Sequence, residues 1–153
     1  MEQTPAFQLN FDGGSRGNPG PAGIGFTIVD AHGNVVDEVG EFIGRCTNNV
    51  AEYTALVKGL ETAIQRGIKH LIIRADSELV VRQIQGIYRV KHPDLKPLHA
   101  RAVQLLAKIP TWSFGHVYRE ANSRADQLAN MAMDRQTRIA FSAPLRHENN
   151  RVD

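Results

Sequence analysis

Four carboxylates fall at the ends of predicted elements, far apart along the chain. Asp12 ends a stretch of alternating apolar and polar residues, and Asp76 ends a short apolar run. Glu52 and Asp126 each fall in the first turn of a predicted amphipathic helix. Because carboxylate oxygens are the ligands that hard divalent cations prefer in proteins, these four acids predict a cation-binding site.

Each acid also has an ordinary structural explanation. Asp12 precedes two glycines and could belong to a plain turn. Asp76 precedes a helix and could interact with its dipole. Glu52 and Asp126 end the runs N-V-A-E and S-R-A-D, which have the spacing of a helix capping box. Taken singly, each of these explanations is at least as good as a functional one.

The structural explanations are weaker for the four acids taken jointly. Glu52 lies at spacing i, i+4 and i+8 with Leu56 and Leu60, so the acid shares the helix face that should meet the core. An acid that faces a core must be paired, protonated or bound to a cation. Four acids that converge at one edge of a sheet would repel one another, and Mg²⁺ is the natural counter-charge.

The predicted elements place these acids on a mixed α/β framework. Strands are predicted over 7–12, 22–30, 35–43, 70–76 and 112–119. Helices are predicted over 50–66, between Ser77 and Gly86, over 95–109 and over 122–134. The first three strands should form an antiparallel meander, and the alternation that follows predicts helices packed on a mixed sheet.

Composition sets the class of protein. The 153 residues fit one domain, and the apolar fraction of 42% and charged fraction of 22% are typical of soluble globular proteins. A net charge of +2 means that any binding to nucleic acid needs locally clustered charge. The single cysteine, Cys46, excludes an internal disulfide and a cysteine-based metal cage. With no signal-like N-terminus and no long apolar run, we expect a cytoplasmic monomer without a membrane segment.

Four motifs resemble, in order and spacing, those of type 1 ribonuclease H. They are Asp12-Gly-Gly-Ser-x-Gly-Asn-Pro-Gly, Thr47-Asn-Asn-x-Ala-Glu52-Tyr, Ala75-Asp76-Ser77 and Arg119-Glu-x-Asn-x-x-Ala-Asp126-x-Leu-Ala. The resemblance covers residues 7–134 and implies the ribonuclease H-like α/β fold, with a five-stranded mixed sheet flanked by helices. It implies a ribonuclease H domain over 1–136 and leaves 137–153 as a polar, flexible tail.

The resemblance also implies an activity. It is that of an endonuclease which hydrolyses the RNA strand of RNA/DNA hybrids and leaves 5′-phosphate and 3′-hydroxyl ends. Asp12, Glu52, Asp76 and Asp126 would hold two Mg²⁺ ions, or Mn²⁺ as a substitute, about 3.5–4 Å apart at the scissile phosphate. The alternatives are a relative that also cleaves double-stranded RNA and a non-catalytic module that binds hybrids. The four acids argue against the non-catalytic module, because crowded negative charge would only weaken its binding to phosphates.

Several further residues match substrate contacts of the family. Asn18, Asn48 and Asn49 match positions that contact the minor groove, where the 2′-hydroxyl distinguishes RNA from DNA. Thr47 matches a position that holds a phosphate of the DNA strand, and Ser77 is also expected to contact the hybrid. Turn and helix-cap roles are the alternative for these residues.

The connection before Asp126 is short, as in the branch of the family that lacks a catalytic-loop histidine. His116 stands about ten residues before Asp126, but it continues the alternation of Trp112, Phe114 and Tyr118 with the residues between them, which places it inside a strand. Arg119 could replace the histidine, since it would put a permanent cation near the phosphate. An arginine that merely ends a strand at the surface is an equally good explanation.

One stretch of the chain is locally basic. It contains a single acid, Asp94, among Arg89, Lys91, His92, Lys96, His99 and Arg101. Such a run could be an ordinary solvated face. Beside a site that cuts phosphodiesters, it predicts a surface that attracts the backbone of the duplex.

Overall fold

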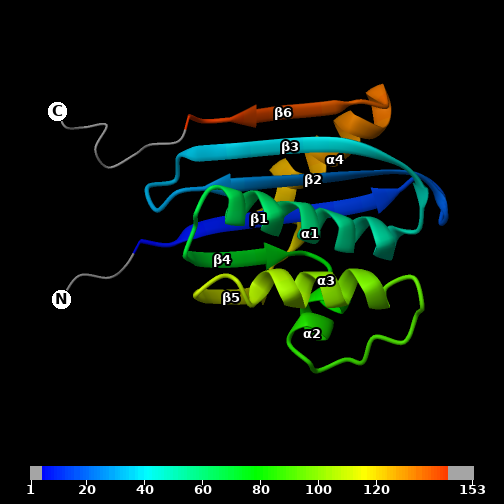
Figure 1. Ribbon diagram of the computed structural model, residues 1–153. Helices are drawn as coiled ribbons and strands as arrows, with labels where there is room; N and C mark the ends of the chain where they lie inside the picture. Colours follow the sequence, from blue (N-terminus) through cyan, green and yellow to red (C-terminus); the bar gives the residue numbers. More distant parts are fainter. Residues whose placement is uncertain (1–4, 145–153) are drawn as a thin grey trace.

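A computed structural model describes residues 5–144 of the chain, and one mixed sheet runs through its centre. The strand order is β5-β4-β1-β2-β3-β6. The strands are β1 (Phe7–Ser15), β2 (Gly20–Val29), β3 (Val35–Cys46), β4 (His70–Ala75), β5 (Thr111–His116) and β6 (Arg138–Ser142). Figure 1 shows helices on both faces of this sheet.

The central strand β1 has a different partner on each side. It pairs antiparallel with β2 and parallel with β4, and β4 pairs parallel with β5. Leu9 and Phe11 of β1 are completely buried, as their alternation with polar residues predicts. The predicted antiparallel meander and mixed sheet are therefore confirmed. The prediction of five strands is wrong by one, because β6 extends the sheet beside β3.

The helices divide between the two faces (Figure 1). One face carries α1 (Asn48–Gln65), α2 (Glu78–Ile84) and α3 (Lys96–Leu106), and the other carries α4 (Ser123–Arg135) after the short 3₁₀ turn η1 (Arg119–Asn122). The apolar face of α1 packs on β1 and β2, and α3 packs against α1. Within residues 5–144, no helix has both the length and the apolar character needed to cross a membrane.

Glycines of β2 and β3 let α4 lie directly on the sheet backbone. A Cβ atom added to Gly25 would lie 2.1 Å from the carbonyl oxygen of Ala125, and one added to Gly40 would lie 2.5 Å from that of Leu128. Gly25 is also the cross-strand partner of Asp12. This close approach of α4 to the sheet is thus beside Asp12, and the residue after Ala125 is Asp126.

We expect Gly25→Ala to destabilise the protein and to slow any reaction at the carboxylates. The added methyl group must displace the backbone of α4, and overpacking of this kind costs about 1–3 kcal/mol of unfolding free energy. Chemical denaturation measures the loss. The matched control is Gly115→Ala in β5, because a Cβ atom there meets no heavy atom within 4 Å. Equal stability of the two variants would contradict the packing argument.

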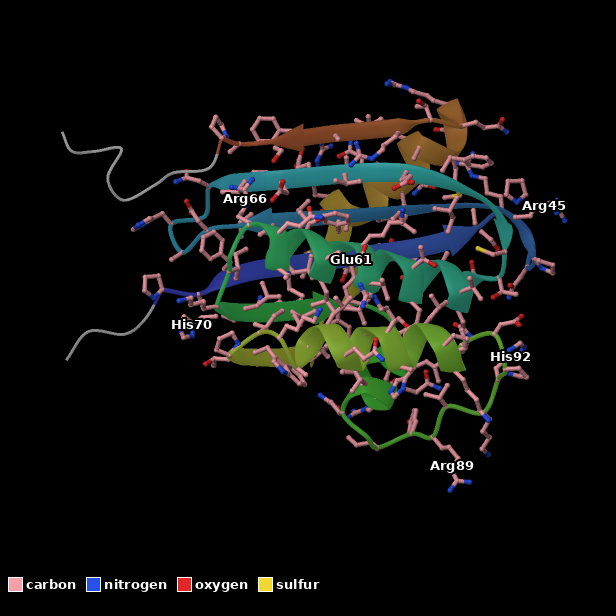
Figure 2. The ribbon with its side chains drawn as sticks, in the orientation of Figure 1. Arg45, Glu61, Arg66, His70, Arg89 and His92 are labelled. Atoms are coloured by element: carbon pink, nitrogen blue, oxygen red, sulfur yellow. The ribbon has the colours of Figure 1, made fainter. Side chains whose placement is uncertain are left out.

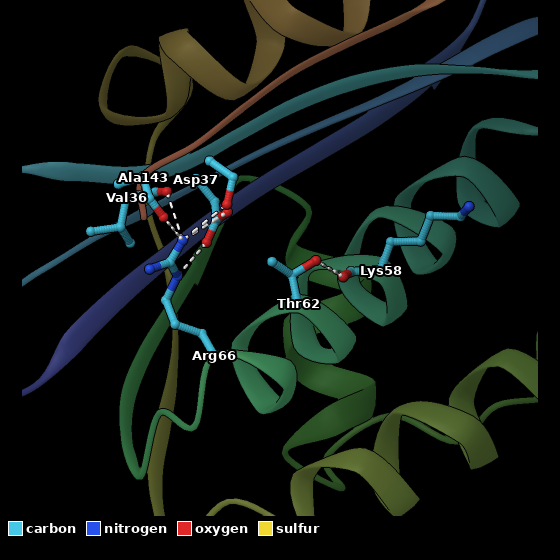
Figure 3. Close-up of polar contacts among 7 residues, drawn as sticks. Val36, Asp37, Lys58, Thr62, Arg66 and Ala143 are labelled. Carbon is cyan, nitrogen blue, oxygen red and sulfur yellow. Dashed lines mark hydrogen bonds and ion pairs between the residues drawn. The ribbon is translucent and has the colours of Figure 1, made fainter. Parts of the chain in front are cut away.

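Strand β6 is held at the edge of the sheet by Arg66, which follows α1 (Figure 3). The guanidinium pairs with Asp37 of β3 at 2.8 Å and donates hydrogen bonds to Ser142 Oγ and the carbonyl oxygen of Ala143, each at 3.0 Å. The expectation of a flexible tail from residue 137 is therefore wrong for Arg138–Ser142. The alternation of Ile139 and Phe141 with polar or small residues is a short period-two signal that could have predicted this strand. Residues 145–153 of the expected tail lie outside the described residues.

Candidate active site

A cavity of about 490 Å³ opens at the edge of the sheet where β4 ends beside β1. The two strands are parallel, and their last paired residues are Phe11 and Ala75. The residue after each is an acid, Asp12 or Asp76, so both carboxylates lie where the pairing of β1 with β4 ends, although β1 itself continues to Ser15 beside β2. The walls of the cavity include eight of the predicted site residues: Asp12, Glu52, Asp76, Asp126, Asn48, Asn49, Ser77 and Arg119.

Gly13, within β1, contacts the first turn of α1 through a hydrogen bond and close backbone packing. Its backbone N–H lies 3.0 Å from Asp12 Oδ1 and 2.5 Å from Glu52 Oε1, so one donor serves both carboxylates. A Cβ atom at this position would lie 2.3 Å from the carbonyl group of Ala51. Only glycine therefore allows α1 to approach β1 closely enough for Glu52 to reach this donor.

Three of the acids form a compact group of oxygen ligands. Asp12, Glu52 and Asp76 each offer a carboxylate oxygen, and these oxygens lie within 4.8 Å of one another. Asp12 and Glu52 are buried, whereas Asp76 is half-buried. Hard carboxylate oxygens at this spacing, open to a cavity, suit a divalent cation such as Mg²⁺ or Mn²⁺. The donor set present in the chain therefore fits the metal that the resemblance implies.

Burial and mutual repulsion make these acids hard to ionise. Burial, followed by the charge of Asp76, raises the pKa of Asp12 to about 7. The pKa of Glu52 is raised well above its usual value, first by burial and then by the charge of Asp12. Burial also raises the pKa of Asp76, while the charge of Arg119 opposes that shift. A bound cation would reverse this preference by favouring the ionised carboxylates.

Asp126 enters the same cavity from the first turn of α4, on the opposite face of the sheet from α1. It lies outside the three-oxygen group, but a hydrogen bond with it contributes to the raised pKa of Asp12. The capping-box explanations for both helix acids are wrong. Thr47, rather than Asn49, caps α1, and Asn122 precedes α4 without a side-chain cap bond.

Most of the remaining residues predicted to contact the substrate make hydrogen bonds within turns and helix caps. Asn18 Oδ1 accepts from the N–H of Asn48 at 3.1 Å, and Asn48 Oδ1 accepts from the N–H of Ser15 at 2.7 Å. Thr47 and Ser77 are the N-caps of α1 and α2. Asn18 and Thr47 are not among the residues that line the cavity, although both adjoin Asn48.

Several residues line the cavity without having been predicted as site residues: Arg16, Tyr118, Asn130 and Met133. The position of Asn130 four residues after Asp126 puts it on the same helix face, so helical periodicity could have identified it.

His116 is the last residue of β5, is exposed, and also lines the cavity. Its ring contacts that of Tyr118 edge-to-face, with centroids 5.8 Å apart. The choice between His116 and Arg119 as substitute for the loop histidine stays a prediction.

Sequence comparison finds relatives along most of the chain. The model of a family described as reverse transcriptase-like matches residues 10–132. Ribonuclease HI of Halobacterium salinarum is 48% identical over 124 residues, which are 81% of this chain and 62% of that protein. Ribonuclease H of Hydrogenovibrio crunogenus is 34% identical over 144 residues, which are 85% of this chain and 97% of that protein. The chain spans only 35% of the length of its mycobacterial relatives.

Comparison with solved structures finds similarity to the same family of proteins. The crystal structure of RNase H1 from Halobacterium salinarum has a TM-score of 0.83 and 46% identity, and the match covers 85% of this chain and 98% of that one. LC11-RNase H1, crystallised in complex with an RNA/DNA hybrid, has a TM-score of 0.79 and 44% identity. That match covers 87% of this chain and 99% of the other.

Proposed function

The chain belongs to the ribonuclease H family, and from that premise we propose that it is a Mg²⁺-dependent endonuclease which hydrolyses the RNA strand of RNA/DNA hybrids. One observation carries the proposal: carboxylate oxygens of Asp12, Glu52 and Asp76 meet within 4.8 Å in an open cavity. Such crowding of acids opposes their ionisation unless a cation binds between them. A similar protein, LC11-RNase H1, has been crystallised with a hybrid, which supports the choice of substrate.

The four acids Asp12, Glu52, Asp76 and Asp126 would hold the metal. When bound there, Mg²⁺ would act as a Lewis acid that lowers the pKa of an attacking water and stabilises negative charge on the departing 3′ oxygen. The chain contributes the positions of the ligands. Gly13 holds Asp12 and Glu52 through one N–H group, and the packing of α4 on Gly25 brings Asp126 to the same cavity.

Arg119 and two asparagines are the proposed contacts of the chain with the substrate. Arg119 is exposed at the cavity wall, where its permanent charge can pair with a phosphate. Asn48 uses its carbonyl oxygen to bind Ser15, so its amide N–H groups remain available to a 2′-hydroxyl. Asn49 is exposed beside it. Asn18 and Thr47 would also fix the backbone at the start of α1, which carries Asn48 and Asn49, and Ser77 would fix the start of α2 beside Asp76, in addition to any direct contact.

Cleavage assays test the proposal directly. Purified protein is incubated with Mg²⁺ and an RNA/DNA hybrid, double-stranded RNA or single-stranded RNA, each labelled on the RNA. We expect cleavage of the hybrid, with 5′-phosphate ends on the products. Cleavage of double-stranded RNA as well would show that the protein is a relative with activity on both kinds of duplex. Binding of the hybrid without cleavage would contradict the proposal and favour a binding module.

The basic connection between α2 and α3 is the proposed second contact with the hybrid. Arg89, Lys91 and His92 are exposed along it, and Figure 2 shows Arg89 and His92 projecting outward from the ribbon. Lys96, also exposed, follows as the first residue of α3. The connection lies at the end of the sheet toward which β1 runs (Figure 1). Two other members of the predicted cluster are engaged elsewhere. Arg101 pairs with Glu61 at 3.3 Å, and His99 Nε2 lies 3.3 Å from the carbonyl oxygen of Gln83.

A buried hydrogen bond fixes the start of this connection. The hydroxyl group of Tyr53 in α1 donates to Gln83 Oε1 at 2.6 Å, and Gln83 Nε2 donates to the carbonyl oxygen of Arg89 at 3.4 Å. Tyr53 is completely buried and directly follows Glu52. The basic connection is thus anchored to the same helix turn that carries one of the proposed metal ligands.

Removing charge from the connection should weaken binding of the hybrid without affecting chemistry. For the double variant Arg89→Gln, Lys91→Gln, we expect a higher KM, an unchanged kcat, and a slope of log KM against log salt smaller by about 1–2, since each lost phosphate contact removes about one unit. Steady-state cleavage from low to high KCl measures this. The matched control is Lys69→Gln, Lys108→Gln, two exposed lysines outside the connection. The same change of slope in the control would show that only net charge matters.

A further inference from the structure

A chain of side-chain amides joins β1 to the segment before α4. Gln8 Nε2 donates to Asn10 Oδ1 at 2.8 Å, and Asn10 Nδ2 donates to Asn122 Oδ1 at 3.1 Å. Asn122 Nδ2 then donates to the backbone carbonyl oxygen of Phe11 at 2.8 Å. Asn10 and Asn122 are buried, with 8% and 1% of their surface exposed. Buried amides are costly unless paired, so each bond in this chain restrains the elements that it joins.

These hydrogen bonds connect two backbone segments that carry acids of the proposed metal site. Phe11, whose carbonyl oxygen accepts the last bond, directly precedes Asp12, and the side chain of Asn10 points to the face of the sheet that α4 covers. Asn122 is the last residue of η1, which begins with Arg119, and it directly precedes α4, which carries Asp126 in its first turn. The amides therefore connect the backbone beside one acid to the backbone beside the other.

Neither asparagine touches the space where a substrate would lie. Asn10 and Asn122 are absent from the residues that line the cavity, so they can act on a reaction there only through the groups they hold. Small displacements of the four acids should matter, because metal ligands must be held in a narrow range of positions. Asn122 occupies the N-cap position of α4, but its side chain makes no cap hydrogen bond to the helix. Its amide group binds Phe11 of β1 instead.

We propose that Asn122, supported by Asn10 and Gln8, is a positioning residue that sets Asp126 and Arg119 relative to Asp12; the inference rests on the proposed nuclease function. It differs from a merely structural role in what it predicts. A structural residue affects how much protein is folded, whereas a positioning residue affects the reaction and the cation affinity of the folded protein.

The experiment compares wild-type protein with Asn122→Ala, at a temperature where melting curves show both to be folded. We expect kcat for hybrid cleavage to fall about 10–100-fold, with KM within about twofold, and Mg²⁺ binding measured by calorimetry to weaken about 10-fold or more. Asn10→Ala should have a smaller effect of the same kind, and Gln8→Ala the smallest. If Asn122→Ala does not fold, Asn10→Ala is judged by the same criteria.

The stability control is Arg66→Lys, which disrupts a hydrogen-bonded network of comparable size that lies outside the cavity lining. We expect it to lower Tm but to leave kcat and Mg²⁺ affinity unchanged. Unchanged kcat and Mg²⁺ affinity in folded Asn122→Ala would overturn the inference, as would an equal loss of kcat in Arg66→Lys. A wild-type protein that does not cleave hybrids contradicts the proposed function instead, and the Mg²⁺ titration still tests the positioning.

Discussion

Asp12→Asn is expected to reduce cleavage of an RNA/DNA hybrid about 10³-fold or more at pH 8. Asp12 lies at the centre of the site, where it shares the N–H donor of Gly13 with Glu52 and offers an oxygen within 4.8 Å of those of Glu52 and Asp76. An asparagine keeps the size of the side chain but removes the charge that attracts the cation, so the loss would fall on metal-assisted stabilisation of the transition state. Single-turnover cleavage of a labelled hybrid measures the effect.

The matched control for this variant is Asp30→Asn. Asp30 lies in the turn between β2 and β3, where its Oδ1 accepts hydrogen bonds from the N–H groups of His32 and Asn34, each at 2.9 Å. An asparagine can accept the same bonds, and the turn is not part of the cavity. We expect its cleavage rate to stay within about twofold of wild type. A small effect of Asp12→Asn, similar to that of Asp30→Asn, would remove Asp12 from the reaction.

Removal of divalent cations is expected to abolish cleavage and to make stability fall as pH rises from 5 to 8. The pKa of Asp12 is about 7 in the folded protein against 3.8 for a free side chain, so the folded state favours the protonated acid. The stability that this preference contributes is complete below pH 3.8 and is lost as pH rises through 7. Between pH 5 and pH 8 we expect a loss of about 1–3 kcal/mol in unfolding free energy.

Addition of Mg²⁺ should reverse most of this loss at pH 8, since a ligand at 100 times its Kd stabilises the folded state by about 2.7 kcal/mol. At pH 5, where protons compete with the cation for the acids, the gain should be smaller. Thermal melting with EDTA or Mg²⁺ at both pH values measures the four cases. Asp12→Asn should be more stable than wild type in EDTA at pH 8 and should respond little to Mg²⁺. Equal melting temperatures for wild type in all four conditions would contradict the electrostatic account of the site.

Much of the site could be predicted because its signals are local. Asp12 and Asp76 each follow an apolar pattern that is readable over a few residues, and the pairing of the parallel strands β1 and β4 ends just before both acids. Glu52 lies on the apolar face of α1, where an acid has no ordinary place. The glycines after Asp12 also showed where another backbone could approach, and α1 does so at Gly13.

Other features depended on partners distant in the sequence. Strand β6 pairs with β3 and is held there by Arg66, and the alternation of Ile139 and Phe141 within its five residues could not by itself indicate that partner. Arg101 looked like part of the basic connection, but its position on α3 turns it toward Glu61 of α1. Asn122 was predicted only as the first residue of a helix, yet its side-chain amide donates to a carbonyl oxygen that is 111 positions away in the sequence.

By itself, then, the sequence determined which residues could bind a cation and which strands and helices carry them, since charge, apolar periodicity and turn residues act over a few neighbours. Only the tertiary structure decided that the acids meet, which donors they share and how far their pKa values rise. Those properties depend on burial and on distances between atoms from different elements, and packing of the whole chain sets both.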